Sequence, residues 1–222
     1  MDKSAWMFWL RRAAGCAVLT CGACADLTGD DVQPLAPALS QDEQSDGGSN
    51  SVQRARARLQ DVAGETVGRA WFVFSRESTF VTVSARLPPE RAGIHGLHVH
   101  ANDVADNGEG CIADPDAEPS THFASVDGHF NPSGETHGHH KGDLPALVVT
   151  GAGEAFLQFR TDQFKPSELQ GRALIIHASS DNYGNVPVGE AEDQYTANSE
   201  AATELTGKTG NAGVRIACGV IE

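Results

Sequence analysis

The chain has 222 residues and a formal net charge of −14 at pH 7, from 30 acidic and 16 basic residues. It contains no run of basic residues, so it lacks the electrostatic footprint of a nucleic-acid-binding protein, and no nucleic-acid partner is expected. An anionic substrate remains compatible with this composition, because the local field at a cleft steers a ligand more than the total charge does.

The N-terminal residues 1–24 have the pattern of an export signal. Lys3, Arg11 and Arg12 precede a small, apolar run that is too short to span a bilayer as a stable helix. The run ends at Cys24, after the kind of small residues that lipoprotein processing favours. We therefore predict an exported protein of the periplasm or cell envelope, whose membrane contact is a lipid anchor on Cys24. A lipid on Cys21 and plain cleavage without an anchor are the alternatives.

Residues 25–51 are rich in Asp, Gln, Ser, Gly and Pro and lack aromatic residues. Such a segment cannot bury enough apolar surface to fold, so it is predicted to be a disordered acidic and polar linker. The remaining residues, 52–222, are long enough for one domain with its own core.

Segments in which apolar and polar residues alternate follow one another from residue 54 onwards. A period of two is typical of half-buried β-strands, and the regular spacing of the segments indicates a β-sandwich or barrel. The predicted strands are residues 54–59, 70–74 and 79–84, a hairpin at 144–159 with its turn at 150–153, a buried strand at 173–176, and 215–221. No helical periodicity is found apart from one turn at residues 166–169.

His98 and His100 are separated by one residue, Val99. On a β-strand both imidazoles point to the same face and can bind one metal from a rigid base, while Val99 points into the core. More candidate ligands follow among strands and Gly-rich turns: His129, His137, His140, Asp143 and His177. These are enough for two metals, because four imidazoles suit copper, and imidazoles with a carboxylate suit tetrahedral zinc.

Five of these residues lie in three motifs: H-V-H at 98–100, H-F-N-P at 129–132 and H-x-G-D-L at 140–144; a fourth motif, G-N-A-G-x-R-x-A-C-G-V-I, occupies 210–221. With these motifs the chain, from about residue 54 to residue 222, resembles the copper/zinc superoxide dismutases in their bacterial exported form. The resemblance implies an all-β fold, an eight-stranded Greek-key β-barrel of the Ig-like sandwich kind, with long metal-binding and active-site loops.

The resemblance also implies the reaction. Superoxide anion would be dismuted to dioxygen and hydrogen peroxide by a copper ion that is alternately reduced and oxidised, with a neighbouring zinc sharing a bridging histidine. A homodimer is compatible with the family. Two alternatives stay open: a copper-only superoxide dismutase with an empty zinc site, and a non-enzymatic copper-binding or copper-delivery protein on the same fold.

Residue by residue, the resemblance assigns copper to His98, His100, His129 and His177, and zinc to His129, His137, His140 and Asp143. His129 is then shared, which an imidazole allows because its two nitrogens lie on opposite sides of the ring. Only two residues separate His137 from His140, fewer than in most relatives, so His139 is an alternative ligand.

Beyond the ligands, the resemblance gives Asp181 hydrogen bonds to one copper histidine and one zinc histidine. Arg215 is expected beside copper, where its guanidinium fork can hold a small anion. Lys208 supplies long-range positive charge and Thr209 narrows the channel. His129 is also expected to deliver a proton to the forming peroxide.

Of the five cysteines, Cys111 and Cys218 fall in the predicted domain. An even pair in an exported domain indicates a disulfide, and the resemblance implies the same bridge. Two buried free thiols would be expected only in a reducing compartment.

Two acidic insertions, residues 112–128 and 187–205, lengthen loops of the domain. His122 in the first is expected in a surface loop. The second is expected to make the approach to copper more acidic. His95 is expected to pack and form hydrogen bonds without binding a metal.

Overall fold

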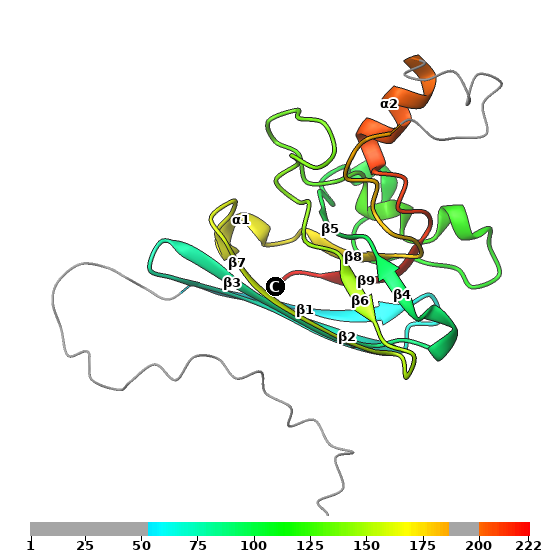
Figure 1. Cartoon of the computed structure of the whole chain (residues 1–222), viewed down its shortest axis with the longest axis horizontal. Coiled ribbons are helices and arrows are strands. Elements are labelled where there is room, and N and C mark those ends of the chain that lie inside the picture. Colours follow the sequence, from blue (N-terminus) through cyan, green and yellow to red (C-terminus); the bar gives the residue numbers. More distant parts are fainter. Residues whose placement is uncertain (1–52, 187–199) are drawn as a thin grey trace, which may run out of the picture. The chain divides into compact units, whose positions relative to one another are not determined.

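The computed structural model describes residues 53–186 and 200–222. The predicted export signal, the predicted linker and residues 187–199 of the second insertion lie outside this range. The described residues form one antiparallel sheet of nine strands (Figure 1): β1 Arg54–Asp61, β2 Thr66–Ser75, β3 Ser78–Arg86, β4 Gly93–His95, β5 Leu97–His100, β6 Leu147–Val149, β7 Glu154–Thr161, β8 Ala173–His177 and β9 Arg215–Val220.

The connections contain helices α1, Pro166–Leu169, and α2, Glu200–Thr209. They also contain four 3₁₀ turns: Pro89–Arg91, Ala105–Asn107, Pro119–Thr121 and Ala124–Val126. Within the described residues, no helix is both long and apolar enough to cross a membrane.

The sheet closes on itself through the strand that carries the H-V-H motif. β4 and β5 stand at the two ends of the strand order β4-β6-β7-β3-β2-β1-β9-β8-β5, yet only Gly96 separates them in the sequence. β4 pairs with β6 and β5 pairs with β8, so one segment of chain joins both edges. Counted as one strand, β4 and β5 give the predicted eight-stranded barrel, and the crossings from β3 to β4 and from β7 to β8 make it a Greek key.

The alternation read from the sequence explains the barrel core. On β1, Ala55, Ala57 and Leu59 are buried, and the residues between them are exposed. Inward side chains of all the long strands join one apolar cluster, and Val99 belongs to it, as predicted. Because Val99 occupies the inward position on β5, its neighbours His98 and His100 face the other side of the strand.

β8 is buried on both faces, which explains its continuous apolar sequence. Leu174 and Ile176 face the barrel core, whereas Ile175 belongs to a second cluster with Phe123 and Cys218. The predicted Cys111–Cys218 disulfide is confirmed, with a Cα–Cα distance of 5.6 Å. It closes a loop across 107 residues, for which the chain-entropy model gives a stabilisation of about 4–5 kcal/mol.

Two expectations about the insertions are wrong. Residues 200–209 form helix α2, where no helical periodicity was recognised; the Ala and Glu residues of this segment favour helix through intrinsic propensity. His122 is buried, with 9% of its surface exposed, instead of lying on the surface. The reason is that the next residue, Phe123, is drawn into the second apolar cluster.

Candidate metal centre

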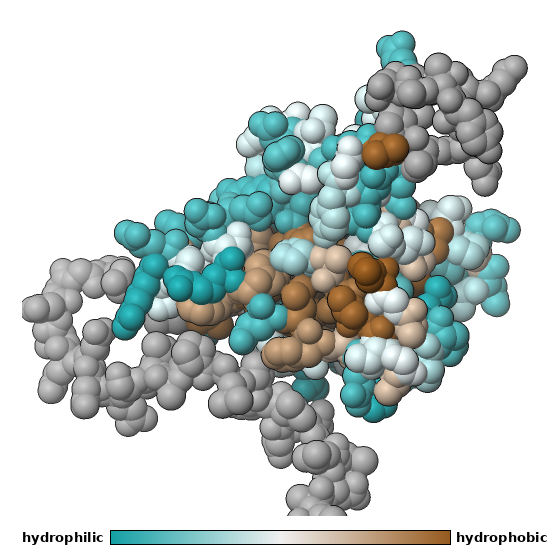
Figure 2. All heavy atoms as spheres, viewed as in Figure 1, coloured by the Kyte–Doolittle hydropathy of each residue, from teal (hydrophilic) through white to brown (hydrophobic). Residues whose placement is uncertain are grey.

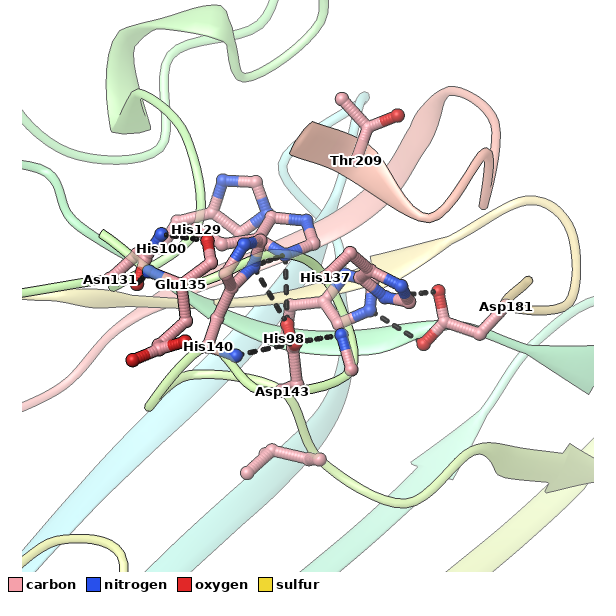
Figure 3. Close-up of polar contacts among 12 residues, drawn as sticks. His98, His100, His129, Asn131, Glu135, His137, His140, Asp143, Asp181 and Thr209 are labelled. Carbon is pink, nitrogen blue, oxygen red and sulfur yellow. Dashed lines mark hydrogen bonds and ion pairs between the residues drawn. The ribbon is translucent and has the colours of Figure 1, made fainter. Parts of the chain in front are cut away.

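Two hydrogen-bonded strands and one loop bring four imidazoles together; those of His98, His100 and His129 are labelled in Figure 3. His98 and His100 project from the same face of β5 and are almost completely buried. His177 is the last residue of β8, which pairs with β5. His129 comes from the loop after the first insertion and forms an isolated bridge with His100. One nitrogen from each of these four rings lies within 4.8 Å of the others, in an arrangement that could hold one metal ion.

The unprotonated nitrogen of His98 is evidence for a metal site. Nε2 of His98 donates a hydrogen bond to Oδ2 of Asp181 at 2.7 Å, so the proton is on Nε2. Nδ1 therefore carries a lone pair, and this buried atom has no hydrogen-bond partner. A buried polar atom without a partner is costly unless a cation or another group satisfies it.

His100 and His177 also each have one ring nitrogen with a free lone pair. Nδ1 of His100 donates to the carbonyl of Asp127 at 2.8 Å, and Nδ1 of His177 donates to the carbonyl of Gly213 at 2.9 Å. The Nε2 atom of each ring is then unprotonated. The two Nε2 atoms lie 3.4 Å apart, with their lone pairs facing each other. Two acceptors at this distance repel unless a cation lies between them, and an all-imidazole donor set suits copper.

Nδ1 of His129 faces a second group of donors. It lies 3.1 Å from Nδ1 of His140 and 2.9 Å from Oδ1 of Asp143, and these two atoms are 3.3 Å apart. Tetrahedral ligands with bonds of about 2.0 Å are about 3.3 Å from one another, so these three donors have the spacing of a zinc site. The alternative ligand His139 is exposed. Oδ2 of Asp143 accepts the backbone N–H groups of Gly138 and His140, which folds this loop around the donors.

His137 is fully buried beside these donors. Its Nε2 lies 3.1 Å from Oδ1 of Asp181, and its Nδ1 lies 3.3 Å from Oδ1 of Asn185. The four-residue donor set that includes His137 consists of His98, His129, His137 and Asp143, and His140 is not part of it. Asp181 thus contacts one histidine from each predicted ligand group, but the four predicted zinc ligands do not form one set.

Burial keeps three of the imidazoles, those of His100, His129 and His177, in the neutral form. It lowers the pKa of His177 to about 3, with a further contribution from His98, and lowers the pKa of His129 to about 4 against the opposing effect of Asp143. Burial, with the charges of His129 and Arg215, also holds the pKa of His100 well below its usual value. Burial alone would raise the pKa of Asp143, but hydrogen bonds to His129 and His140 hold it far below the ordinary range. These four groups are therefore in the forms that bind metals.

In the metal-free protein, stability should fall as the pH drops from about 6.5, the ordinary histidine value, to about 4, the pKa of folded His129. An unfolded histidine takes up a proton in this range while folded His129 and His177 do not, so the unfolded state binds more protons and gains population. The pKa of His137 is raised by Asp181 against the effect of burial. His137 therefore has the opposite effect and adds stability as the pH falls. Calorimetric melting temperatures at pH 7 and pH 4.5 test this.

The exposed His139 offers the matched control. The His139→Gln variant should show the same loss of stability between pH 7 and pH 4.5 as the unaltered chain. Equal melting temperatures at both pH values would contradict the assignment of the buried histidines as neutral.

Arg215, the first residue of β9, is held by the first insertion. Its guanidinium donates hydrogen bonds to the carbonyl groups of Phe123 and Asp127. The Asp127 carbonyl also accepts the hydrogen bond from His100, so one residue orients both a candidate ligand and the arginine. The carboxylate of Asp127 accepts the backbone N–H groups of residues 103 and 104 and the side-chain amide of Asn107, which ties down the loop after β5.

A cavity of about 340 Å³ opens beside the imidazoles. Its lining includes His100, His129, His177, Lys208, Thr209 and Arg215. Figure 3 shows Thr209 at the end of α2, on one side of the rings. Lys208 is paired with Glu204 one helical turn earlier, and this hydrogen bond lowers the pKa of Glu204. The three residues predicted to guide substrate therefore line one small, partly positive cavity.

Comparison with known proteins agrees with this arrangement. The family model "Copper/zinc superoxide dismutase (SODC)" matches residues 66–221. The chain belongs to the copper/zinc superoxide dismutase family. The copper-zinc superoxide dismutase of Mycolicibacterium paratuberculosis is 34% identical over 223 residues, covering 94% of each chain. That of Deinococcus radiodurans is 35% identical over 171 residues, covering 71% of this chain and 87% of the relative.

The solved structure of the Cu/Zn superoxide dismutase from Brucella abortus has the same fold. It aligns with a TM-score of 0.55 and 22% identity, and the match covers 77% of this chain and all of that chain. Members of this family bind copper and zinc, and the two donor groups around His129 fit these metals in ligand type.

Several residues of this superoxide dismutase family site escaped the sequence analysis. Asp127 and Phe123 act through backbone carbonyls, which leave no signal in side-chain type. Asn185 donates to the carbonyl of His137, and the ring of Tyr183 stacks on His137 with centroids 6.3 Å apart. Only the Asp127-Gly128 pair carries a sequence signal, because it is typical of a turn just before the H-F-N-P motif.

Proposed function

We propose that this chain catalyses the dismutation of superoxide to dioxygen and hydrogen peroxide. In this proposal copper is held by His98, His100, His129 and His177, and zinc by His129, His137, His140 and Asp143. The observation that carries it is the pair of lone pairs on His100 and His177, which face each other beside a cavity that also contains Arg215. When bound, copper supplies a one-electron redox couple, and zinc supplies a fixed positive charge beside the shared imidazole.

The side chains around the cavity bring the substrate in and position it. Lys208 attracts the anion from a distance, and Thr209 limits the width of the entrance. Arg215 uses two N–H groups to bind backbone carbonyls, and its other N–H groups are available to hold superoxide. Because the guanidinium is fixed at two points, it holds the bound anion in one orientation.

His129 supplies a proton on the side of its ring that faces the cavity. Its Nδ1 faces Asp143, so Nε2 is the atom from which a proton reaches the substrate. One superoxide loses an electron and leaves as dioxygen, and a second gains that electron and two protons, one from His129 and one from solvent, and leaves as hydrogen peroxide. Asp181 keeps the ring of His98 in place throughout, through its hydrogen bond to Nε2.

Metal analysis combined with superoxide decay tests this function. The purified protein should contain copper and zinc in equal amounts and should accelerate superoxide decay in stopped-flow measurements. Chelation should remove the activity, and copper should restore it. A fully copper-loaded protein that leaves the rate of superoxide decay unchanged would exclude the dismutase and favour a copper carrier. The described residues hold no free thiol for copper(I), since Cys111 and Cys218 are bonded to each other.

The second candidate is a copper-only superoxide dismutase, and the position of His137 favours it. His137 contacts Asp181 and Asn185, whereas the close donors beside His129 are His140 and Asp143. A native protein with full copper, no zinc and full activity would select this form.

We also propose that the chain is exported and anchored through a lipid on Cys24. The support is the charged N-terminus followed by an apolar run that ends at this cysteine. The mature protein should be found in the membrane fraction, and mass spectrometry should show an acylated Cys24 as its first residue. The matched variant Cys24→Ser should move the protein to the soluble fraction. A soluble native protein that begins after Cys24 would exclude the anchor and leave export in place.

A homodimer is also proposed, and an exposed apolar patch supports it. Figure 2 shows hydrophobic side chains on the face that β4 and β6 form. Ile94 and Val148 are paired across these strands and are 55% and 59% exposed. Light scattering should give the mass of two chains, and the Val148→Asp variant should give the mass of one.

A further inference from the structure

Asp127 has a backbone conformation that almost only glycine adopts. Its φ is 63° and its ψ is −156°, and any side chain in this region strains the backbone. Glycine would take the same conformation without strain. A strained residue persists only where its surroundings hold it, and such residues occur where the position of a group matters for function. The contacts of the carboxylate and of the carbonyl of Asp127 indicate which group is held.

The carboxylate of Asp127 binds the loop after β5. Its Oδ2 accepts the backbone N–H groups of Asp103 and Val104 at 2.8 and 2.9 Å, and its Oδ1 accepts the side-chain amide of Asn107 at 2.7 Å. The carbonyl groups of the residues on either side of Asp127 accept the backbone N–H groups of the two residues that follow β5. The side chain therefore fixes the strained residue against this loop.

The carbonyl oxygen of Asp127 binds two side chains from other parts of the barrel. It accepts one hydrogen bond from Nδ1 of His100, at 2.8 Å, and another from Nη2 of Arg215. His100 ends β5 and Arg215 begins β9, so one oxygen fixes a proposed copper ligand relative to the arginine proposed to hold superoxide. A displacement of about 1 Å in such a group can slow a reaction about a hundredfold. The direction of this carbonyl therefore matters for the rate.

The second acceptor for Arg215, the carbonyl of Phe123, is held in a different way. Phe123 also has a positive φ, 55°, but its side chain is buried in the second apolar cluster. Close packing of the ring fixes the Phe123 carbonyl without a charged group. Asp127 is half-buried and has no apolar side chain to pack, so its hydrogen-bonded carboxylate performs this function.

We propose that the carboxylate of Asp127 positions Arg215 for the binding of superoxide. The carboxylate acts through its own backbone carbonyl, which orients the guanidinium, so Asp127 is a positioning residue. This inference rests on the dismutase function proposed above and adds a side chain to it. Without the carboxylate, Arg215 keeps its charge but loses one of the two fixed points that give the bound anion a single orientation.

Asp127→Gly is the main test, because glycine adopts this backbone conformation without strain and removes only the carboxylate. With rates expressed per bound copper, it should slow superoxide decay roughly tenfold. Asp127→Asn should restore most of the rate, because its amide oxygen can accept the N–H groups of Asp103 and Val104. The control Asp106→Gly removes an exposed carboxylate from the loop after β5 and should keep the full rate.

A double variant distinguishes positioning from a general loosening of the fold. In a chain that already carries Arg215→Ala, Asp127→Gly should slow the reaction by less than about twofold, because the carboxylate acts through Arg215. A purely structural role, or a role through His100 alone, would slow both chains by the same factor. Equal slowing, or a full rate in Asp127→Gly, would overturn the proposal.

A measurement on the metal-free protein does not depend on the dismutase function. The Nη–H NMR signals of Arg215, identified by their loss in Arg215→Ala, should be resolved in the unaltered chain and in Asp127→Asn, because hydrogen bonds hold both Nη groups. In Asp127→Gly they should merge with those of mobile arginines, and signals that stay resolved would overturn the proposal even if the chain proves inactive. If Asp127→Gly does not fold, Asn107→Ala, which removes one bond to the carboxylate, replaces it with the same criteria and a smaller effect.

Discussion

Replacing Asp143 with alanine should abolish zinc binding while copper can still be loaded. Oδ1 of Asp143 is the acidic donor beside His129 and His140, and its Oδ2 holds the backbone of the loop that carries these ligands. The change removes a charged donor and leaves buried groups without their partner. Stability of the metal-loaded protein should fall by about 3 kcal/mol or more. Metal analysis and calorimetry measure the two effects.

A second variant distinguishes the role of Asp143 as a metal donor from its role in holding the loop through hydrogen bonds. Asp143→Asn keeps an oxygen that can accept the N–H groups of Gly138 and His140, but it places an uncharged amide among the donors. Zinc should be lost as in the alanine variant, whereas the metal-free protein should lose less stability. The control Asp162→Ala removes an exposed carboxylate and should change neither quantity. Unchanged zinc content in Asp143→Ala would mean that the zinc assignment is wrong.

Replacing Arg215 with alanine should slow superoxide decay by roughly ten- to a hundredfold, with copper content unchanged. Arg215 lines the cavity beside His100 and His177 and is fixed by two backbone carbonyls. The positive charge of Arg215 raises the local concentration of superoxide, and the forked N–H groups of its guanidinium position the bound anion. Arg215→Lys should recover part of the rate, because an ammonium attracts the anion without offering the fork. Stopped-flow kinetics with metal analysis of each variant measure this.

Salt and a neighbouring carboxylate refine the test of Arg215. The rate should fall as ionic strength rises, because attraction over a distance is screened. Glu204→Gln should raise the rate slightly, since Glu204 is paired with Lys208 at the cavity. The control Arg91→Ala removes an exposed charge that does not line the cavity and should leave the rate unchanged. A full rate in Arg215→Ala with copper present would refute the role assigned to Arg215.

The periodicity of the sequence was sufficient to predict most of the barrel. Alternation around Leu59 and Val83 was visible because one side of each strand meets the core and the other meets solvent. Helix α2 was not predicted, because its residues show no clear helical periodicity in the sequence and intrinsic propensity alone is a weak signal. His122 was misplaced for a related reason: its burial follows from the packing of Phe123 in a distant cluster.

At the metal centre, the sequence by itself predicted the candidate ligands and their order, because metal chemistry restricts ligands to a few side chains. The tertiary structure decided which nitrogen of His100 and of His177 is free, since backbone carbonyls at Asp127 and Gly213 fix the protons. It also decided that Arg215 is held by the first insertion, and that Asp127 ties this insertion to the loop after β5. Residues on separate strands and loops become neighbours only through strand pairing and packing, so these contacts cannot be read from spacing along the chain.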